Sequence, residues 1–335
     1  MVNIVDDKIL KIRSLKVIFP TERGIVKAVE GIDFDVHKGE CVAIVGESGC
    51  GKSVSSLAFM RLLQTPPAIV DTKVHEFDGV DIRNYSEKQM KGILGTKMTM
   101  IFQDALSALN PVIKVGKQID EIYVKKLGYS KKDAKIASIE ILRLVGVPSP
   151  EKRYNDYPHQ LSGGMRQRAL IGMSFASDPK LMIADEPTTA LDVTIEAQIL
   201  QLLKDLQKKN NMALVLITHD LSVVRRVADR VYVMYCGKIV EEGPTKDVFN
   251  NPRHPYTQGL INSMPKIGTE KQEFTQIPDN VPHPLNKPEG CYFRPRCSHT
   301  DPIICKDGMS PLVDIGGARC VRCWNPLKNK VGEDK

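Results

Sequence analysis

The sequence predicts an α/β protein in which helices cover both faces of a parallel sheet, followed by a small loop-rich region. Three observations lead to this prediction. Short apolar runs alternate with segments of helical periodicity, a glycine-rich loop follows one such run, and proline gathers near the end of the chain. Strands that alternate with helices usually lie parallel, because each helix returns the chain across the sheet.

Three short apolar runs predict buried strands: CVAIV (41–45), LMIAD (181–185) and ALVLIT (213–218). They are too short for typical helices and contain β-branched residues. Segment 195–209 predicts a helix, because its apolar residues recur at the spacing of one helix face. Those residues are Ile195, Ile199, Leu202, Leu203 and Leu206.

Proline marks a boundary late in the chain. Eleven of the 21 prolines follow Asn250, which predicts a tail that is poor in long helices. Because 335 residues are many for one domain, we expect a large domain at 1–250 and an extension at 251–335. A small extension buries little core, and a bound metal could supply the missing stability.

The composition, with 42% hydrophobic and 26% charged residues, is that of a globular protein with a buried core. No run approaches 18 apolar residues, and the start MVNIVDDKIL carries acids, so we expect neither a membrane span nor a secretory signal. The net charge of +7 permits an anionic partner, but an evenly solvated surface explains it equally well. In the cytosol disulfides are rare, so clustered cysteines indicate metal ligands.

The loop GESGCGKS (46–53) matches the P-loop pattern of nucleotide-binding proteins. Its glycines let backbone N–H groups turn toward a phosphate without obstruction, and a helix starting near Lys52 adds its positive dipole end. We expect Lys52 to reach the β- and γ-phosphates of ATP and the Ser53 hydroxyl to bind Mg²⁺. The predicted nucleotide-binding set here is Gly46, Glu47, Ser48, Gly49, Cys50, Gly51, Lys52, Ser53 and Val54.

Cys50 allows two interpretations. A thiol at a helix N-terminus can have a lowered pKa and become reactive, in which case alkylation should block ATPase activity and ATP should protect. Alternatively, cysteine is simply a small residue that fits the loop.

Two acids and a histidine follow the second and third predicted strands. Asp185 ends a buried strand, where a carboxylate needs a cation or hydrogen bonds, and we expect it to hold Mg²⁺. Glu186 is expected to polarise the water that attacks the γ-phosphate. His219 leaves the sheet at the edge where ligands bind in open α/β folds, so we expect it to contact the γ-phosphate.

Six motifs in order resemble the ABC-type ATPase family over about residues 8–250. They are GESGCGKS, FQD (102–104), LSGGMRQR (161–168), LMIADEP (181–187), ALD (190–192) and ITHD (217–220). The resemblance implies a P-loop NTPase core of RecA-like fold with a β-subdomain, a helical subdomain at about 85–175, and a small loop-rich C-terminal cysteine domain.

The same resemblance implies further site residues. Gln103 would sense the γ-phosphate and Mg²⁺, and Asp192 would link two ATP sites across a subunit interface. Phe19 would stack on adenine, unless it is an ordinary aromatic at the end of a strand. The residues that would close over the ATP of a facing subunit are Ser162, Gly163 and Gly164.

The tail resembles the C-terminal extension of the ATP-binding subunits of dipeptide and oligopeptide importers. The stretches that carry this resemblance are NPRHPYTQGLINSMP (251–265), IPDNVP (277–282) and GCYFRPRC (290–297). One departure is visible, because the family's usual Pro-Gly here reads Pro278-Asp279. This substitution places the geometry of that turn in question.

Five of the eight cysteines lie in the extension. In the family that it resembles, such cysteines can hold a [4Fe–4S] cluster, and the implied ligands are Cys291, Cys297, Cys305 and Cys323. Cys320 is then the extra cysteine, although by spacing alone Cys320 and Cys323 form a C-x-x-C pair and both could bind metal. Structural zinc is the alternative to the cluster, and free thiols are the third possibility.

The resemblance therefore implies an ATPase subunit that powers import of dipeptides or oligopeptides. Its expected partners are a second, non-identical ATPase subunit and two membrane permeases fed by an external peptide-binding protein, at the cytoplasmic face of the membrane. One alternative is an importer of nickel or another small solute. Another is a non-transport ABC ATPase acting on ribosomes or DNA, but such proteins usually carry two ATPase units or a long coiled coil, so no nucleic acid partner is expected.

Overall fold

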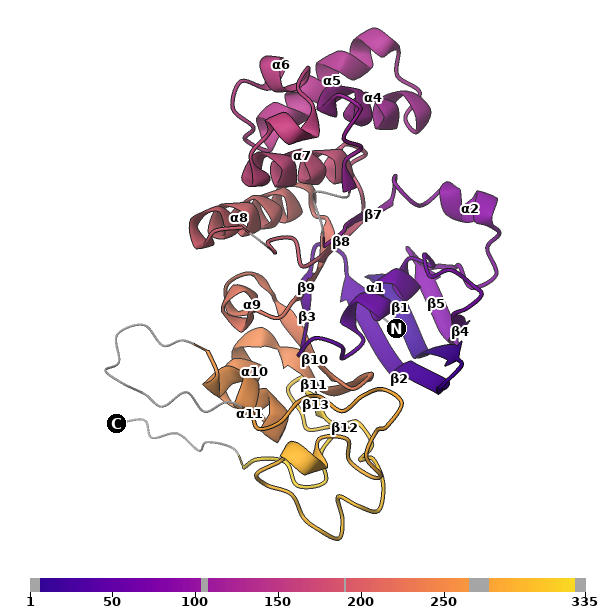
Figure 1. Ribbon diagram of the computed structural model, residues 1–335, viewed down its shortest axis with the longest axis vertical. Helices are drawn as coiled ribbons and strands as arrows, with labels where there is room; N and C mark the ends of the chain where they lie inside the picture. The colour runs from indigo at the N-terminus through magenta and orange to yellow at the C-terminus, as the bar shows by residue number, and fades with distance from the viewer. Residues whose placement is uncertain (1–6, 104–107, 190, 265–276, 329–335) are drawn as a thin grey trace, which may run out of the picture. The chain divides into compact units, whose positions relative to one another are not determined.

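The computed structural model describes residues 7–103, 108–189, 191–264 and 277–328 (Figure 1). Four expectations touch residues outside these ranges: the missing secretory signal at 1–6, Asp104 of FQD, Ala190 of ALD and Pro265 of the stretch 251–265. The chain forms two compact units that are each assembled from distant segments. The first unit contains Met1–Leu10, Asp35–Cys41 and Glu76–Leu216, and the second contains Lys11–Phe34, Val42–His75 and Ile217–Lys335. These units do not divide at residue 250, so the separate extension at 251–335 stays a prediction.

The first unit carries the helices and a set of parallel strands. Strand β7 (Met98–Ile101) pairs in parallel with β8 (Leu181–Asp185), with Met98 opposite Leu181, and β9 (Ala213–Thr218) lies on the other side of β8. Strands β5 (Val74–Phe77) and β6 (Val80–Asp81) form an antiparallel hairpin. The helices are α2 (Glu87–Lys91), α4 (Val115–Lys125), α5 (Lys131–Leu144), α6 (Pro150–Arg153), η1 (Pro158–Gln160), α7 (Gly163–Phe175) and α8 (Val193–Asn210). All of these except α8 lie within the expected helical subdomain.

The second unit contains the glycine-rich loop and the tail. Its strands β12 (Val313–Asp314), β13 (Cys320–Val321), β11 (Lys238–Pro244), β10 (Arg230–Tyr235) and β3 (Cys41–Val45) lie side by side in this order. Strand β3 runs parallel to β10, whereas β10, β11 and β13 are antiparallel neighbours. The other elements are β1 (Lys8–Thr21), β2 (Gly24–His37), β4 (Ile69–Asp71), α1 (Lys52–Phe59), α9 (Leu221–Val227), α10 (Thr245–Asn250), α11 (Pro255–Asn262) and η2 (Arg294–Arg296).

The three apolar runs are strands with the predicted bounds. Every residue of β3, β8 and β9 is buried, which explains why these runs are continuous rather than alternating. Helix α8 extends the predicted 195–209 by a few residues, because Asp192 caps its N-terminus. No helix among the described residues is both long and apolar enough to cross a membrane.

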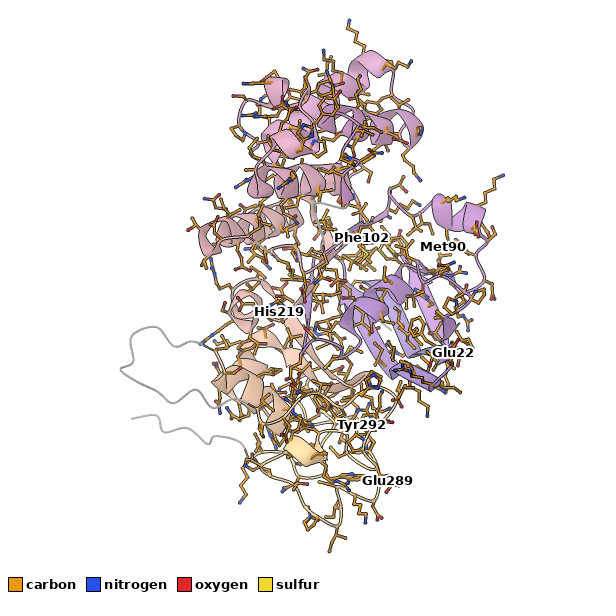
Figure 2. All side chains as sticks on the ribbon, in the orientation of Figure 1. Glu22, Met90, Phe102, His219, Glu289 and Tyr292 are labelled. Carbon is orange, nitrogen blue, oxygen red and sulfur yellow. The ribbon has the colours of Figure 1, made fainter. Side chains whose placement is uncertain are left out.

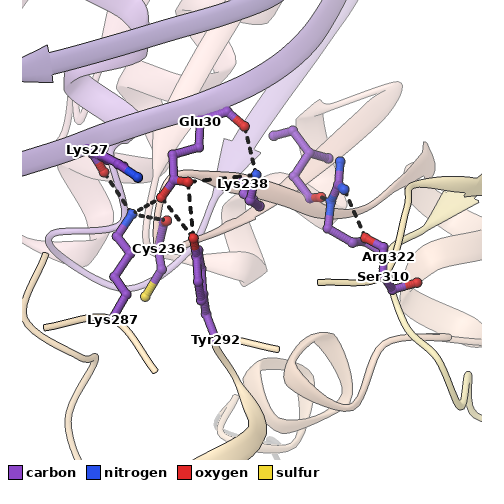
Figure 3. Close-up of polar contacts among 9 residues, drawn as sticks. Lys27, Glu30, Cys236, Lys238, Lys287, Tyr292, Ser310 and Arg322 are labelled. Carbon is purple, nitrogen blue, oxygen red and sulfur yellow. Dashed lines mark hydrogen bonds and ion pairs between the residues drawn. The ribbon is translucent and has the colours of Figure 1, made fainter. Parts of the chain in front are cut away.

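The described part of the tail, residues 251–264 and 277–328, is loop-rich, as predicted, and it packs on the strands of the second unit. Its strand β13 adds to the edge of β11. In the loop before η2, the Lys287 ammonium donates to the carbonyl of Cys236 at 2.8 Å and to the Glu30 carboxylate of β2 at 2.6 Å (Figure 3). The Tyr292 hydroxyl also donates to Glu30, at 3.0 Å (Figure 3). Polar contacts with the body of the unit therefore help to hold the short elements of the tail in place.

At Pro278-Asp279, the aspartate has a left-handed backbone conformation. Asp279 adopts a φ of 59°, in the left-handed region that favours glycine. Aspartate and asparagine enter this region more readily than most other residues. Asp279 therefore adopts a backbone conformation that a glycine would favour at this position.

Candidate functional site

The glycine-rich loop joins β3 to α1 in the second unit, as predicted. Glycine is required at two positions, because a Cβ at Gly46 would lie 2.2 Å from the Met234 carbonyl oxygen and one at Gly51 would lie 2.5 Å from that of Ala28. Gly51 is also the N-cap of α1 and makes no side-chain cap. The amides at the start of α1 are therefore not capped by a side chain at this position, as a phosphate-binding helix terminus requires.

Lys52 is the first residue of α1 and is 6% exposed. Its ammonium donates to the backbone carbonyls of Gly46 at 2.8 Å and Glu47 at 3.0 Å, the first two residues of the loop. Next to it, Ser53 is half-buried. These two hydrogen bonds fix the ammonium of Lys52 next to the start of the loop.

Cys50 is fully buried, and burial raises the pKa of its thiol. The alternative of a reactive thiol with a lowered pKa is therefore wrong. Desolvation of the thiolate outweighs the opposing effects of the Cys236 backbone and the Lys52 charge on this pKa. Cysteine is present here as a small buried residue, which agrees with the second interpretation.

The acids lie at the end of β8 in the first unit. Asp185 is 4% exposed, and Glu186 follows it with a φ of 47°. A positive φ is uncommon for a residue with a long side chain and is concentrated at functional sites. The Glu186 carboxylate accepts hydrogen bonds from the Gln103 amide at 2.9 Å and from the Thr189 hydroxyl at 3.1 Å. The structure therefore brings together two predicted site residues, Gln103 and Glu186, and adds Thr189, which sequence reasoning missed.

The LSGGM turn begins helix α7. The Ser162 hydroxyl caps the helix by accepting from the Met165 amide at 3.3 Å. A Cβ at Gly164 would lie 2.8 Å from Cγ2 of Ile195 in α8, so this glycine permits the close approach of the two helices. Asp192 caps α8 by accepting from the Ile195 amide at 2.9 Å. Ser162 and Asp192 thus have local capping roles, and their predicted roles at a subunit interface stay predictions.

Two further predicted residues lie in or at the edge of the second unit. His219 is exposed and precedes α9 by one residue (Figure 2), and the intervening Asp220 caps that helix by accepting from the Ser222 amide at 2.7 Å. Phe19 lies half-buried near the end of β1. Their contacts with the γ-phosphate and with adenine stay predictions.

Four of the tail cysteines line one pocket of the second unit. They are Cys291, Cys297, Cys305 and Cys323. Burial is the main cause that raises the pKa of three of them, and the other thiols add to the effect at Cys323, whose pKa is about 12. Cys320 lies instead in β13, opposite Glu242 of β11. Within the residues that the structure describes, no group of three or more histidine, cysteine or acidic side chains converges to hold a metal ion.

Glu47 of the glycine-rich loop contacts two residues that sequence reasoning missed. The Glu47 amide donates to the Tyr256 hydroxyl at 2.9 Å, and the Glu47 carboxylate accepts two hydrogen bonds from Arg296. Arg296 lies within the stretch GCYFRPRC that carried the family resemblance, but its spacing from the loop contains no signal for this contact.

The chain matches two known protein families. Residues 29–189 match the family described as ABC transporter, and residues 240–305 match the family described as Oligopeptide/dipeptide transporter, C-terminal region. The chain is 48% identical to the oligopeptide transport ATP-binding protein OppD of Bacillus subtilis, over 95% of this chain and 88% of OppD. It is 46% identical to the dipeptide transport ATP-binding protein DppD of Escherichia coli, over 95% of this chain and 97% of DppD.

Solved structures share the fold of the ATPase part. The dimeric post-hydrolysis state of the ATP-binding cassette MJ0796, bound to ADP and phosphate, aligns with a TM-score of 0.63 at 25% identity. The alignment covers 70% of this chain and 98% of the MJ0796 chain. The ABC transporter component cbiO1 of Clostridium perfringens aligns with a TM-score of 0.60 at 27% identity, over 73% of this chain and 92% of cbiO1.

Proposed function

Because this chain belongs to the family of ATP-binding subunits of oligopeptide and dipeptide ABC transporters, we propose that it hydrolyses ATP to drive peptide import. The observation that carries this proposal is 48% identity over 95% of the chain, which includes the ATPase part and the C-terminal region. It is an ATPase of the ABC type. Fold alone would not support a substrate, but the match of residues 240–305 to the peptide-transporter C-terminal region does.

Phosphate binding is assigned to the glycine-rich loop and to Lys52. The ammonium neutralises the β- and γ-phosphates, while backbone N–H groups at the start of α1 bind their oxygens. Ser53 and Asp185 offer a hydroxyl and a carboxylate oxygen, which are the donors that Mg²⁺ prefers, and they would hold the ion. Once bound, Mg²⁺ would offset the negative charge of the β- and γ-phosphates.

Hydrolysis is assigned to Glu186. Its carboxylate takes the proton of the water that attacks the γ-phosphorus, while the bond to the leaving β-phosphate oxygen breaks. The Gln103 amide donates to that carboxylate at 2.9 Å, which supports a shared role in orienting the attacking water. His219 is assigned a contact with the γ-phosphate, and Phe19 a stacking contact with adenine.

Dimerisation follows from the family and from the LSGGM turn. Ser162, Gly163 and Gly164 begin α7, and we assign them to the ATP bound by a facing subunit, with Asp192 linking the two sites. The solved relative MJ0796 is dimeric, which supports this assembly. The facing subunit is proposed to be a second, non-identical ATPase. Both would dock on two membrane permeases that an external peptide-binding protein supplies, with this chain peripheral at the cytoplasmic face.

Uptake by cells tests the proposed substrate. Deleting the gene for this chain should abolish uptake of a labelled dipeptide or oligopeptide, and the parental chain should restore it. The control is uptake of labelled nickel, which should be unchanged. Lost nickel uptake with normal peptide uptake would contradict the peptide assignment, and co-purification with ribosomes or DNA instead of permeases would contradict transport itself.

We also propose that Cys291, Cys297, Cys305 and Cys323 bind a [4Fe–4S] cluster. Four cysteines around one pocket match the ligands of such a cluster in number and kind. Each thiolate of a cluster binds a different iron atom, so the sulfurs need not converge on one point as they do around zinc. The pocket that these cysteines help to line has a free volume of about 10 Å³. The cluster would stabilise the tail.

Cysteine variants separate the ligands from the extra thiol. Cys323→Ser should lose the brown colour, iron and acid-labile sulfide of protein purified without oxygen, because it removes one of four ligands. Cys320→Ser should retain all three, since Cys320 lies in β13 outside the pocket. Colourless parental protein that contains zinc and no iron would support the zinc alternative and contradict the cluster.

A further inference from the structure

The C-terminal extension contacts Glu47 of the phosphate loop through Arg296 and Tyr256. The Arg296 guanidinium donates to the two carboxylate oxygens of Glu47, from Nη1 to Oε2 at 2.8 Å and from Nη2 to Oε1 at 2.9 Å. A bidentate pair of this kind restricts both the position and the orientation of the carboxylate. Since Glu47 is the second residue of the glycine-rich loop, its position also restricts the loop backbone.

Every N–H group of the Arg296 guanidinium makes a hydrogen bond. The side chain is 2% exposed. Besides Glu47, it donates to the carbonyls of Pro278 at 2.7 Å and Asp279 at 2.9 Å, and to the Tyr235 hydroxyl at 3.4 Å. Together with the two bonds to Glu47, these contacts account for all five N–H groups of a guanidinium. A lysine could not reproduce this pattern, because its ammonium has three N–H donors on one nitrogen instead of five in a planar fork.

A second contact holds the same loop residue through its backbone. The Glu47 amide donates to the hydroxyl of Tyr256, which is fully buried in α11. The Tyr256 ring packs against Tyr235, with ring centroids 4.6 Å apart, and against Phe293 at 5.3 Å. The tyrosines that support Glu47 and Arg296 therefore belong to one aromatic cluster.

We propose that Arg296 is a positioning residue, which holds the phosphate loop through Glu47 in the shape that binds a triphosphate. The inference rests on the proposed function, since it requires that this loop bind ATP. A loop already held in its bound shape loses less conformational freedom on binding, so its affinity is higher. The extension thereby sets the ATP affinity of the subunit from outside the nucleotide site.

The test compares Arg296→Met with Arg319→Met. Both arginines are buried, lie in the extension and pair with a glutamate, but Arg319 pairs with Glu241 of β11 at 2.9 Å instead of with the loop. The measurements on each purified chain are the Kd of MgATP, the KM and kcat of ATP hydrolysis, and the melting temperature. Arg296→Met should raise Kd and KM about tenfold, which corresponds to about 1.4 kcal/mol, with a smaller change in kcat.

Arg319→Met should lower the melting temperature without changing the Kd of MgATP. If both variants weaken ATP binding equally, Arg296 acts through general stability and the inference is wrong. The same holds if Arg296→Met binds MgATP as the parental chain does. If the parental chain fails to bind MgATP, the proposed function itself is wrong. This result is distinguishable from a failure of the inference, because it is seen without any variant.

A double-mutant cycle gives a second test that does not depend on the folding of Arg296→Met. Glu47→Gln retains one carbonyl acceptor and should weaken MgATP binding less than the loss of the arginine does. Arg296→Lys should weaken binding in the parental chain but have little further effect in the Glu47→Gln chain, because its target is already altered. Fully additive effects on Kd would show that the two residues act independently and would overturn the proposal.

Discussion

Glu186→Gln should hydrolyse ATP at least about a hundredfold more slowly than the parental chain, while it binds MgATP with nearly unchanged affinity. Glutamine has the same shape and can still contact the amide of Gln103, but it cannot accept a proton at neutral pH. The backbone at this position has a φ of 47°, which either side chain can adopt equally well. The substitution therefore removes the proposed base without a change of fold.

Single-turnover hydrolysis of radiolabelled ATP and equilibrium binding separate the two effects. Glu121→Gln, which changes an exposed carboxylate paired with Lys125 in α4, serves as the control and should retain the parental rate. The Glu186→Gln chain should also form a lasting dimer in MgATP, alone or with its partner ATPase, because ATP remains at the interface. Turnover near the parental rate would rule out Glu186 as the base.

Lys52→Ala should weaken ATP binding, raising the Kd of MgATP by at least about 100-fold, which corresponds to about 3 kcal/mol. The substitution removes the charge that neutralises the phosphates. It also leaves the carbonyls of Gly46 and Glu47 without the ammonium that now donates to them at 2.8 and 3.0 Å. Both losses act on the loop, so hydrolysis should fall because the nucleotide is not bound.

Isothermal titration with MgATP measures this loss directly. The control is Lys238→Ala, which removes another lysine of the second unit that donates to the Glu30 carbonyl at 2.9 Å (Figure 3). This control should retain its affinity for MgATP even if its stability falls. A Lys52→Ala chain that binds MgATP normally and hydrolyses it slowly would show that Lys52 acts in the chemical step alone.

Local sequence predicted the elements that carry the loop and the acids. The runs CVAIV, LMIAD and ALVLIT are strands at their predicted bounds, since an unbroken apolar run of this length is stable only when both faces are buried. The sequence also predicted the start of the helix after Gly51, because a helix follows the glycine-rich turn of a P-loop at a fixed spacing. Burial decided between the two interpretations of Cys50, because desolvation depends on packing that the loop sequence does not encode.

Its sequence by itself determined that this protein has a phosphate loop, paired acids at a strand end and an LSGGM turn, because each is a local pattern whose chemistry requires fixed residue types. Only the tertiary structure decided what the tail does to the loop. Arg296 and Tyr256 lie 249 and 209 residues from Glu47 along the chain, and no periodicity or spacing records such a contact. Their hydrogen bonds arise because packing of the tail on the second unit brings these distant segments together.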